Sequence, residues 1–337
     1  MITTNKNNLK NIIKPSRGLI YDCFTFFNEL DMLEIRLNIL DPIVDKFVLV
    51  EATKTQNNKN KPLFYKLNKH RYKKFADKII HIVVDKYPKN ISQWTIENYQ
   101  RNCITKGLKQ CNDNDIIMIS DLDEIPNPKL VTKYTSTLQF GTIVAFNMYV
   151  FFLYINLWDP NRICTNVTKI LYYKDLKNIL NDIYYKNGTV EENINKGTTA
   201  TKIRRYTGSK QKFIQNAGWH FTWLGNEEKT LKKLLAVCEG DKKATIDDAK
   251  IHRKNLFRKL KPVALNKFFP EYIVKNQKLY KHLITEQKYN YFPYAMIFYT
   301  IRKKLYTGFF HFISCFIFNK KLRHKIRNCK IIREMNW

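Results

Sequence analysis

Hydrophobic and polar positions in the first half of the chain alternate between short apolar runs and amphipathic segments. The apolar runs are rich in β-branched and aromatic residues, which predicts strands at residues 19–27, 46–51, 79–84, 116–120 and 142–154. Continuous runs of this kind are typical of strands buried on both faces of a parallel sheet. The order of the segments therefore predicts an α/β fold with a mostly parallel sheet, flanked by helices and joined by right-handed crossovers.

Apolar positions three and four residues apart predict the helices. Between the first two strands, Asn28 is expected to be an N-cap with Asp31 at the third helical position. That helix should end before Pro42, because a residue preceding proline is pushed out of the α region. Further helices are predicted at residues 94–109, at residues 227–239 and after Pro270.

An acidic motif, Asp121-Leu122-Asp123-Glu124, directly follows the predicted strand at residues 116–120. In open α/β sheets, ligands bind in the crevice outside the carboxyl ends of the strands. Carboxylate oxygens there suit Mg²⁺ or Mn²⁺, which also hold the phosphates of nucleotides. An acidic loop that caps a helix after Pro126 explains the motif equally well, so the motif alone leaves both interpretations open.

Composition narrows the class of protein. Hydrophobic residues make up 44% and aromatic residues 14% of the 337 residues, which supports a folded core. The net charge of +30 favours anionic partners, although a general enrichment in Lys, Asn and Ile explains it as well. The seven cysteines are scattered without a Cys-x-x-Cys pair, which argues against a disulfide framework or a zinc site. Residues 1–14 lack the apolar core of a signal peptide, so we expect a cytoplasmic protein without a transmembrane helix.

Two further acidic residues follow predicted strands. Glu29 comes after the first strand and Glu51 ends the second, so both are expected near the crevice of Asp121 and Asp123. Glu51 would suit nucleoside hydroxyls, as acidic residues at the end of a second strand do in dinucleotide-binding folds. Glu29 serves equally well at a helix N-terminus, where its charge compensates the helix dipole.

Two other clusters each allow two interpretations. Glu97 and Arg101 lie one turn apart on a predicted helix, so they either pair with each other or leave Arg101 to bind a diphosphate. His220 lies between Trp219 and Trp223 in a segment bracketed by glycines. It is either a metal ligand beside aromatic walls that stack on a sugar, or a satisfied core residue.

Several spaced segments together resemble glycosyltransferase family 17. The resembling positions are Glu97, Arg101, Asn102 and residues 24–37, 44–52, 61–63, 120–126 and 217–220. The best-known members of this family transfer N-acetylglucosamine to N-glycans. The predicted organisation is a polar segment at residues 1–17, a glycosyltransferase domain at residues 18–285, and a helical, basic and aromatic extension at residues 286–337.

The resemblance implies a GT-A-type, Rossmann-like fold and an inverting, metal-dependent glycosyltransferase. The expected donor is a nucleotide sugar, UDP-N-acetylglucosamine, and the expected acceptor is a hydroxyl of a glycan or another glycoconjugate. Asp121, Asp123 and His220 would hold Mn²⁺ or Mg²⁺. An inverting transfer also needs a carboxylate that takes the acceptor's proton. Glu124 is preferred because it adjoins the metal motif.

The same resemblance supplies the remaining candidate residues. Two other carboxylates, Glu29 and Asp159, are alternatives for the general base. The predicted substrate contacts are Glu51, Arg101, Asn102, Trp219 and Trp223.

The C-terminal extension lies outside the resemblance. Residues 305–318 form an apolar, aromatic run of 14 residues between basic flanks. A helix needs about 20 residues to span a bilayer, so this run is too short. We expect either peripheral contact of residues 291–330 with an anionic membrane or a helix packed on the domain.

The competing function is a basic protein that binds nucleic acid or another polyanion without catalysis. Such a protein would need basic residues clustered on one face together with a recognised reader motif. The positive charge is instead spread along the chain, and the acidic loop would repel phosphates. No nucleic-acid partner is therefore expected.

Overall fold

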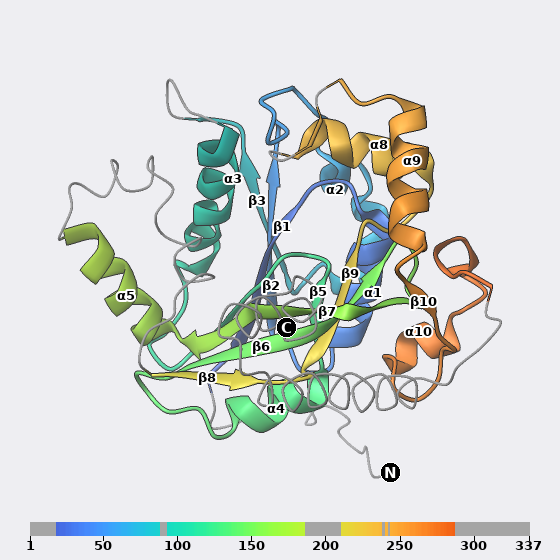
Figure 1. Ribbon diagram of the computed structural model, residues 1–337. Coiled ribbons are helices and arrows are strands. Elements are labelled where there is room, and N and C mark those ends of the chain that lie inside the picture. The colour runs from blue at the N-terminus through green and yellow to red at the C-terminus, as the bar shows by residue number, and fades with distance from the viewer. Residues whose placement is uncertain (1–17, 88–92, 186–209, 238–239, 242, 287–337) are drawn as a thin grey trace, which may run out of the picture.

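The computed structural model of the protein describes residues 18–87, 93–185, 210–237, 240–241 and 243–286 (Figure 1). The predicted polar N-terminal segment and the predicted membrane-contacting residues 291–330 lie outside these ranges. None of the helices in the described ranges combines the length and the apolar character that a membrane span requires.

The strands and helices follow one another in the order that the segments of the sequence predict for the first half of the chain. The strands are β1 (Ile20–Phe26), β2 (Lys46–Ala52), β3 (Ile79–Val84), β4 (Ile116–Ile119), β5 (Glu124–Pro126), β6 (Ile143–Phe152), β7 (Leu157–Tyr172), β8 (Gln211–Ile214), β9 (Gly218–Thr222) and β10 (Lys261–Pro262). The α-helices are α1 (Leu30–Leu40), α2 (Phe64–Leu67), α3 (Gln93–Asn102), α4 (Pro128–Thr135), α5 (Tyr173–Tyr185), α8 (Glu227–Ala236), α9 (Ile246–Phe257) and α10 (Glu271–Lys275). Short 3₁₀ helices are η1 (Lys69–Phe75), η2 (Cys103–Leu108) and η3 (Lys281–Leu283).

The described strands form one sheet in the order β3-β2-β1-β4-β7-β6-β9-β5, with β10 paired to β7 and β8 paired to β6. Strands β3, β2, β1 and β4 are parallel, and Tyr21 of β1 lies opposite Lys46 of β2 and Ile117 of β4. This 3-2-1-4 order is that of doubly wound, dinucleotide-binding sheets. The predicted α/β class, with a Rossmann-like parallel sheet between helices, is confirmed for this half of the sheet (Figure 1).

Beyond β4 the sheet becomes mixed. Strand β7 is antiparallel to both β4 and β6, and β9 is parallel to β6 but antiparallel to β5. As a result, β5, which begins inside the acidic motif, lies beside β9, and Glu124 faces His220 across that pair. The mixed half of the sheet therefore brings two candidate regions together that are almost a hundred residues apart in sequence.

Alternate residues of the parallel strands face two separate cores. Phe24 and Phe26 of β1 pack in a large core with helix α1 and the strands of the mixed half. Tyr21 and Cys23 pack on the opposite face in a second core with η2 and Leu176 of α5. Strands buried on both faces favour apolar residues at most positions, which is why their sequences are nearly continuous apolar runs.

The N-terminus of α1 differs from the prediction. The helix begins at Leu30, so the N-cap is Glu29 and not Asn28, and the Glu29 side chain makes no capping hydrogen bond. Asp31 does not close a capping box because it accepts hydrogen bonds from Arg71 at 2.7 Å and contacts His282 at 2.9 Å. These contacts join α1 to η1 and η3.

Strand β7 was not predicted. Its ends are buried, but its middle is exposed and contains Pro160, Asn161 and Arg162. A polar middle breaks the apolar run by which the other long strands are recognised. The prediction of one helix at residues 94–109 was also too simple, because α3 ends at Asn102 and the chain continues as η2.

Candidate active site

A cavity of about 510 Å³ opens at the carboxyl ends of the parallel strands. This volume lies within the range of roughly 300–1,000 Å³ that is usual for ligand pockets. The walls come from the end of β1, the loop after β2, α3, the acidic loop after β4, β9 and α8. The charged residues among them are Glu29, Lys54, Lys61, Glu97, Arg101, Asp121, Asp123, His220 and Lys233.

The acidic loop is a tight turn that closes on itself. The amide of Asp121 donates to Glu124 Oε2 at 2.8 Å, and the amide of Glu124 donates to the carbonyl of Asp121 at 3.1 Å. Helix α4 is capped by Asn127, whose side chain accepts the amide of Lys129 at 3.0 Å. The alternative interpretation of the acidic motif as a helix cap is therefore wrong.

A buried arginine holds this loop from behind. Arg36 of α1 is fully buried, and its guanidinium donates to both carboxylate oxygens of Asp22 at 2.8 and 2.7 Å. Its Nη1 also donates to the main-chain carbonyls of Asp121, Leu122 and Glu124 at 3.0, 3.1 and 2.8 Å. Arg36 thereby fixes the backbone from which the acidic side chains project.

Sequence reasoning gave no role to Arg36 or Asp22. The signal was present, because Arg36 interrupts the apolar face of α1 and Asp22 interrupts an apolar strand. Charged residues are rarely buried unless they are paired, so two such interruptions in neighbouring elements indicate a buried ion pair.

Asp121 faces an arginine across the cavity wall. Arg101 Nη2 lies 3.0 Å from Asp121 Oδ1 and 2.9 Å from Glu97 Oε1. Arg101 thus makes the predicted pair with Glu97 and also lines the cavity. Its planar guanidinium, held between two carboxylates, presents a fixed positive charge at the cavity wall.

Asp123 and His220 form the centre of the site. His220 Nε2 lies 3.5 Å from Asp123 Oδ1, and Lys233 Nζ lies 3.8 Å from Asp123 Oδ2. Burial opposes the charged form of Asp123, but His220 and Lys233 lower the pKa of this carboxyl below its ordinary value. Burial likewise opposes the imidazolium, but Asp123 and Cys164 raise the pKa of His220 well above its usual range. In the absence of a cation, the two residues therefore form an ion pair.

Glu29 and Trp223 complete the set of predicted residues that line the cavity. Glu29 is the N-cap of α1, three residues after the end of β1. Trp223 has a positive φ of 58°, which is strained for an aromatic residue. Its ring packs 5.3 Å from Lys233 Nζ and 4.9 Å from the ring of His252. These contacts hold the indole against the cavity in spite of the strain.

Glu51 is not among the lining residues. It is fully buried, and its carboxylate accepts the amides of Tyr65 and Lys66 at 2.8 and 3.4 Å at the start of α2. Its second contact is His81 Nε2 at 3.1 Å. The Glu51 side chain near the carboxyl end of β2 therefore supports helix α2.

Three other predicted residues also lie outside the cavity lining. Trp219 precedes His220 in β9, so its side chain points to the opposite face, where it packs against Phe268. Asp159 accepts the amide of Asn161 at 2.9 Å within β7. Asn102 is buried at the end of α3.

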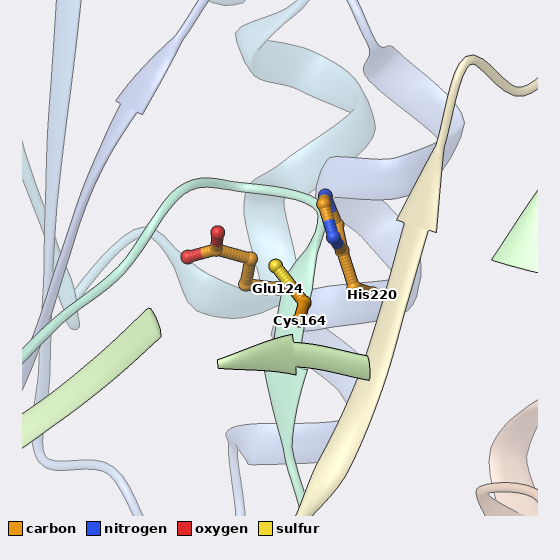
Figure 2. A group of neighbouring side chains, drawn as sticks. All are labelled: Glu124, Cys164 and His220. Atoms are coloured by element: carbon orange, nitrogen blue, oxygen red, sulfur yellow. The ribbon is translucent and has the colours of Figure 1, made fainter. Parts of the chain in front are cut away.

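Glu124 has a different position from its neighbours in the motif. Its side chain is fully buried behind the loop, beside Cys164 of β7 and His220 of β9 (Figure 2). The structure thus gathers Asp121, Asp123 and His220 at the cavity, while Glu124 lies beneath them. Two carboxylates and an imidazole are suitable ligands for Mn²⁺, and the carboxylates also suit Mg²⁺.

Comparisons with known proteins identify one family. A profile of glycosyltransferase family 17 matches residues 8–287. The human and rat β-1,4-mannosyl-glycoprotein 4-β-N-acetylglucosaminyltransferases are each 26% identical over 235 residues, which are 64% of this chain. The chain spans 42% of the length of these relatives. A solved glycosyltransferase involved in the glycosylation of the major capsid of PBCV-1 matches 70% of this chain and 99% of its own, with 9% identity and a TM-score of 0.28.

Proposed function

Because the chain belongs to glycosyltransferase family 17, we propose that it transfers N-acetylglucosamine from UDP-N-acetylglucosamine to a hydroxyl of a glycan or glycoconjugate. The observation that carries this proposal is the cavity at the carboxyl ends of the parallel strands. It contains two carboxylates of the acidic loop, Asp121 and Asp123, together with four basic side chains. Carboxylates for a cation and cations for phosphates are the two requirements for holding a nucleoside diphosphate.

Asp121, Asp123 and His220 would hold Mn²⁺ or Mg²⁺ in this proposal. The donor set fits, because hard divalent cations prefer carboxylate oxygens and imidazole is an accepted ligand of Mn²⁺-like metals. When bound, such an ion would neutralise charge on the diphosphate leaving group. Arg101 and Lys233 already contact Asp121 and Asp123, so they are in position to bind phosphate oxygens once the carboxylates bind a cation.

The transfer itself exchanges one bond for another. The acceptor oxygen forms a bond to the anomeric carbon, the bond from that carbon to the diphosphate oxygen breaks, and the nucleoside diphosphate leaves with the electron pair. An inverting reaction of this kind needs a carboxylate to accept the proton of the acceptor hydroxyl. Glu29 is the best supported candidate because it lines the cavity. Glu124 is fully buried and accepts the Asp121 amide, and Asp159 is outside the lining.

Trp223 is the favoured contact for a sugar ring. Its indole lines the cavity near Asp123 and His220, and aromatic faces stack on the apolar faces of sugars. The contact with Lys233 keeps the ring in place.

Donor hydrolysis tests the proposed function. The protein is incubated with a panel of nucleotide sugars and Mn²⁺, and the release of nucleoside diphosphate is measured. We expect release from UDP-N-acetylglucosamine and loss of release when the divalent cation is chelated. If no nucleotide sugar is turned over and none binds in a cation-dependent way, the proposed function is wrong.

Replacing Glu29 with glutamine should slow transfer without weakening donor binding. General-base catalysis contributes at least about 10²-fold, so we expect kcat to fall by that order while the KM for the donor stays unchanged. Glu228→Gln is the matched control, because Glu228 is an exposed carboxylate in the first turn of α8. A KM increase with unchanged kcat would assign Glu29 to binding and contradict its role as the base.

A further inference from the structure

A second group of metal-ligand side chains lies directly beneath the acidic loop. Glu124 of β5, Cys164 of β7 and His220 of β9 lie close together, and one donor atom of each lies within 4.8 Å of the others (Figure 2). Glu124 is buried, while Cys164 and His220 are partly buried. The three residues come from three strands that are far apart in the sequence, so no sequence motif identifies the group. The sequence-based expectation that the chain lacks a zinc site rested on the absence of such a motif.

The donor atoms differ in kind from those at the cavity. A thiolate sulfur, an imidazole nitrogen and a carboxylate oxygen are the ligands of Zn²⁺, whereas Mg²⁺ and Mn²⁺ favour oxygen. A catalytic zinc ion usually has three protein ligands and one coordination position that is open to water. We propose that Glu124, Cys164 and His220 form a site for one Zn²⁺-class cation, which shares His220 with the cation site proposed at Asp121 and Asp123.

The hydrogen bonding of the cluster supports a cation. His220 Nδ1 is buried and has no hydrogen-bond partner among the described residues, while Nε2 faces Asp123 at 3.5 Å. A buried ring nitrogen without a partner costs free energy that a metal ligand bond would recover. Glu124 Oε2 accepts the Asp121 amide at 2.8 Å, which ties this carboxylate to the acidic loop.

The backbone that carries these ligands is held rigidly. Arg36 donates to the carbonyl of Glu124 at 2.8 Å, and the ladder between β5 and β9 places Glu124 opposite His220. Met148 of β6 pairs with Cys164, and Val150 of the same strand pairs with His220. Ligands on strands of one sheet are positioned more precisely than ligands on loops. Binding would release the thiol proton of Cys164 and any proton on His220, since metal ligands must be deprotonated.

The site is tested with Co²⁺, which replaces Zn²⁺ and reports sulfur ligation by its absorption spectrum. The full chain is treated with a chelator, returned to metal-free buffer and titrated with Co²⁺. We expect a thiolate-to-cobalt charge-transfer band that saturates at one equivalent and disappears when Zn²⁺ is added. Cys164→Ser should remove this band, and Glu124→Gln should weaken Co²⁺ binding on the order of tenfold or more.

Two variants distinguish this site from cation binding elsewhere on the protein. Cys111→Ser is the matched control and should keep the band, because Cys111 is also partly buried but burial raises the pKa of its thiol to about 12. Asp121→Asn combined with Asp123→Asn should keep the band as well, whether or not the protein is a glycosyltransferase. Wild-type protein that gives no band, or a band that persists in Cys164→Ser with unchanged intensity, overturns the proposal. Circular dichroism of each variant confirms that it is folded.

Discussion

Arg36→Met is expected to lower the free energy of unfolding by about 3–5 kcal/mol, which is the usual cost of removing one partner of a buried ion pair. Arg36 and Asp22 are both fully buried, so the variant leaves the Asp22 carboxylate without its countercharge in an apolar environment. The carbonyls of Asp121, Leu122 and Glu124 also lose the donor that satisfies them. Methionine fills a similar volume, so the loss is electrostatic and not a packing defect.

Urea unfolding measures this effect. Arg71→Met is the matched control, because Arg71 pairs with Asp31 at 2.7 Å but its side chain remains 30% exposed. Because water still reaches Arg71 and its carboxylate partners, the control should lose less unfolding free energy than Arg36→Met. Adding Asp22→Asn to Arg36→Met should recover part of the loss, because the uncompensated buried charge is then gone. A loss in Arg36→Met no greater than in Arg71→Met would contradict the assigned role.

The same contacts link the stability of the fold to the geometry of the site. Arg36 is part of a core helix, yet three of its hydrogen bonds go to the loop that carries Asp121 and Asp123. Because a planar guanidinium fixes several acceptors at once, lysine cannot replace it there. The acidic side chains therefore project from a backbone that is anchored in the protein interior.

The strands that were predicted from the sequence share one physical property. Strands β1, β2, β3, β4 and β6 are continuous apolar runs, and all except β3 are almost completely buried. Strand β7 pairs with β4, β6 and β10 but has an exposed polar middle, and β5 has only three residues. Hydrophobic periodicity reports burial, so it cannot detect strands that are short or partly exposed.

The sequence also predicted only part of the candidate active site. Asp121 and Glu29 meet at the cavity because the carboxyl ends of parallel strands share one edge of the sheet, and Arg101 reaches the same cavity from helix α3. Glu51 lies near the carboxyl end of β2 in the same sheet, yet its side chain turns to the amides at the start of α2. The position after a strand fixes where a residue lies but not which groups its side chain contacts.

His220 was a candidate for a different reason, namely its place between two tryptophans in the sequence. Its actual neighbours are Asp123, Glu124 and Cys164, which are brought together by the pairing of β9 with β5 and β6. That pairing joins segments far apart along the chain. Periodicity within one segment contains no information on such pairing, so the cluster beneath the loop could not be predicted from the sequence.

The double variant Asp121→Asn/Asp123→Asn is expected to reduce nucleotide-sugar turnover by a factor on the order of 10³ or more, since removal of one electrostatic stabiliser of the transition state typically costs 10²–10³-fold. Asparagine keeps the size of each side chain but removes both charges that would hold the cation. The measurement is kcat for release of nucleoside diphosphate, together with the Mn²⁺ concentration that gives half-maximal rate.

The variant Asp247→Asn/Glu271→Gln is the control for the loss of two negative charges. It removes two carboxylates that pair with lysines on the surface. This control should retain turnover, because exposed ion pairs contribute little and both residues lie outside the cavity lining. In the double variant at the acidic loop, Lys233 loses the charge of Asp123 and Arg101 keeps Glu97 as a charged partner, so both basic groups remain at the cavity wall for phosphate. Donor binding should therefore persist in part even though turnover is lost. Turnover within about tenfold of the wild type would show that neither carboxylate holds a catalytic cation, because a lost ligand of that ion costs more.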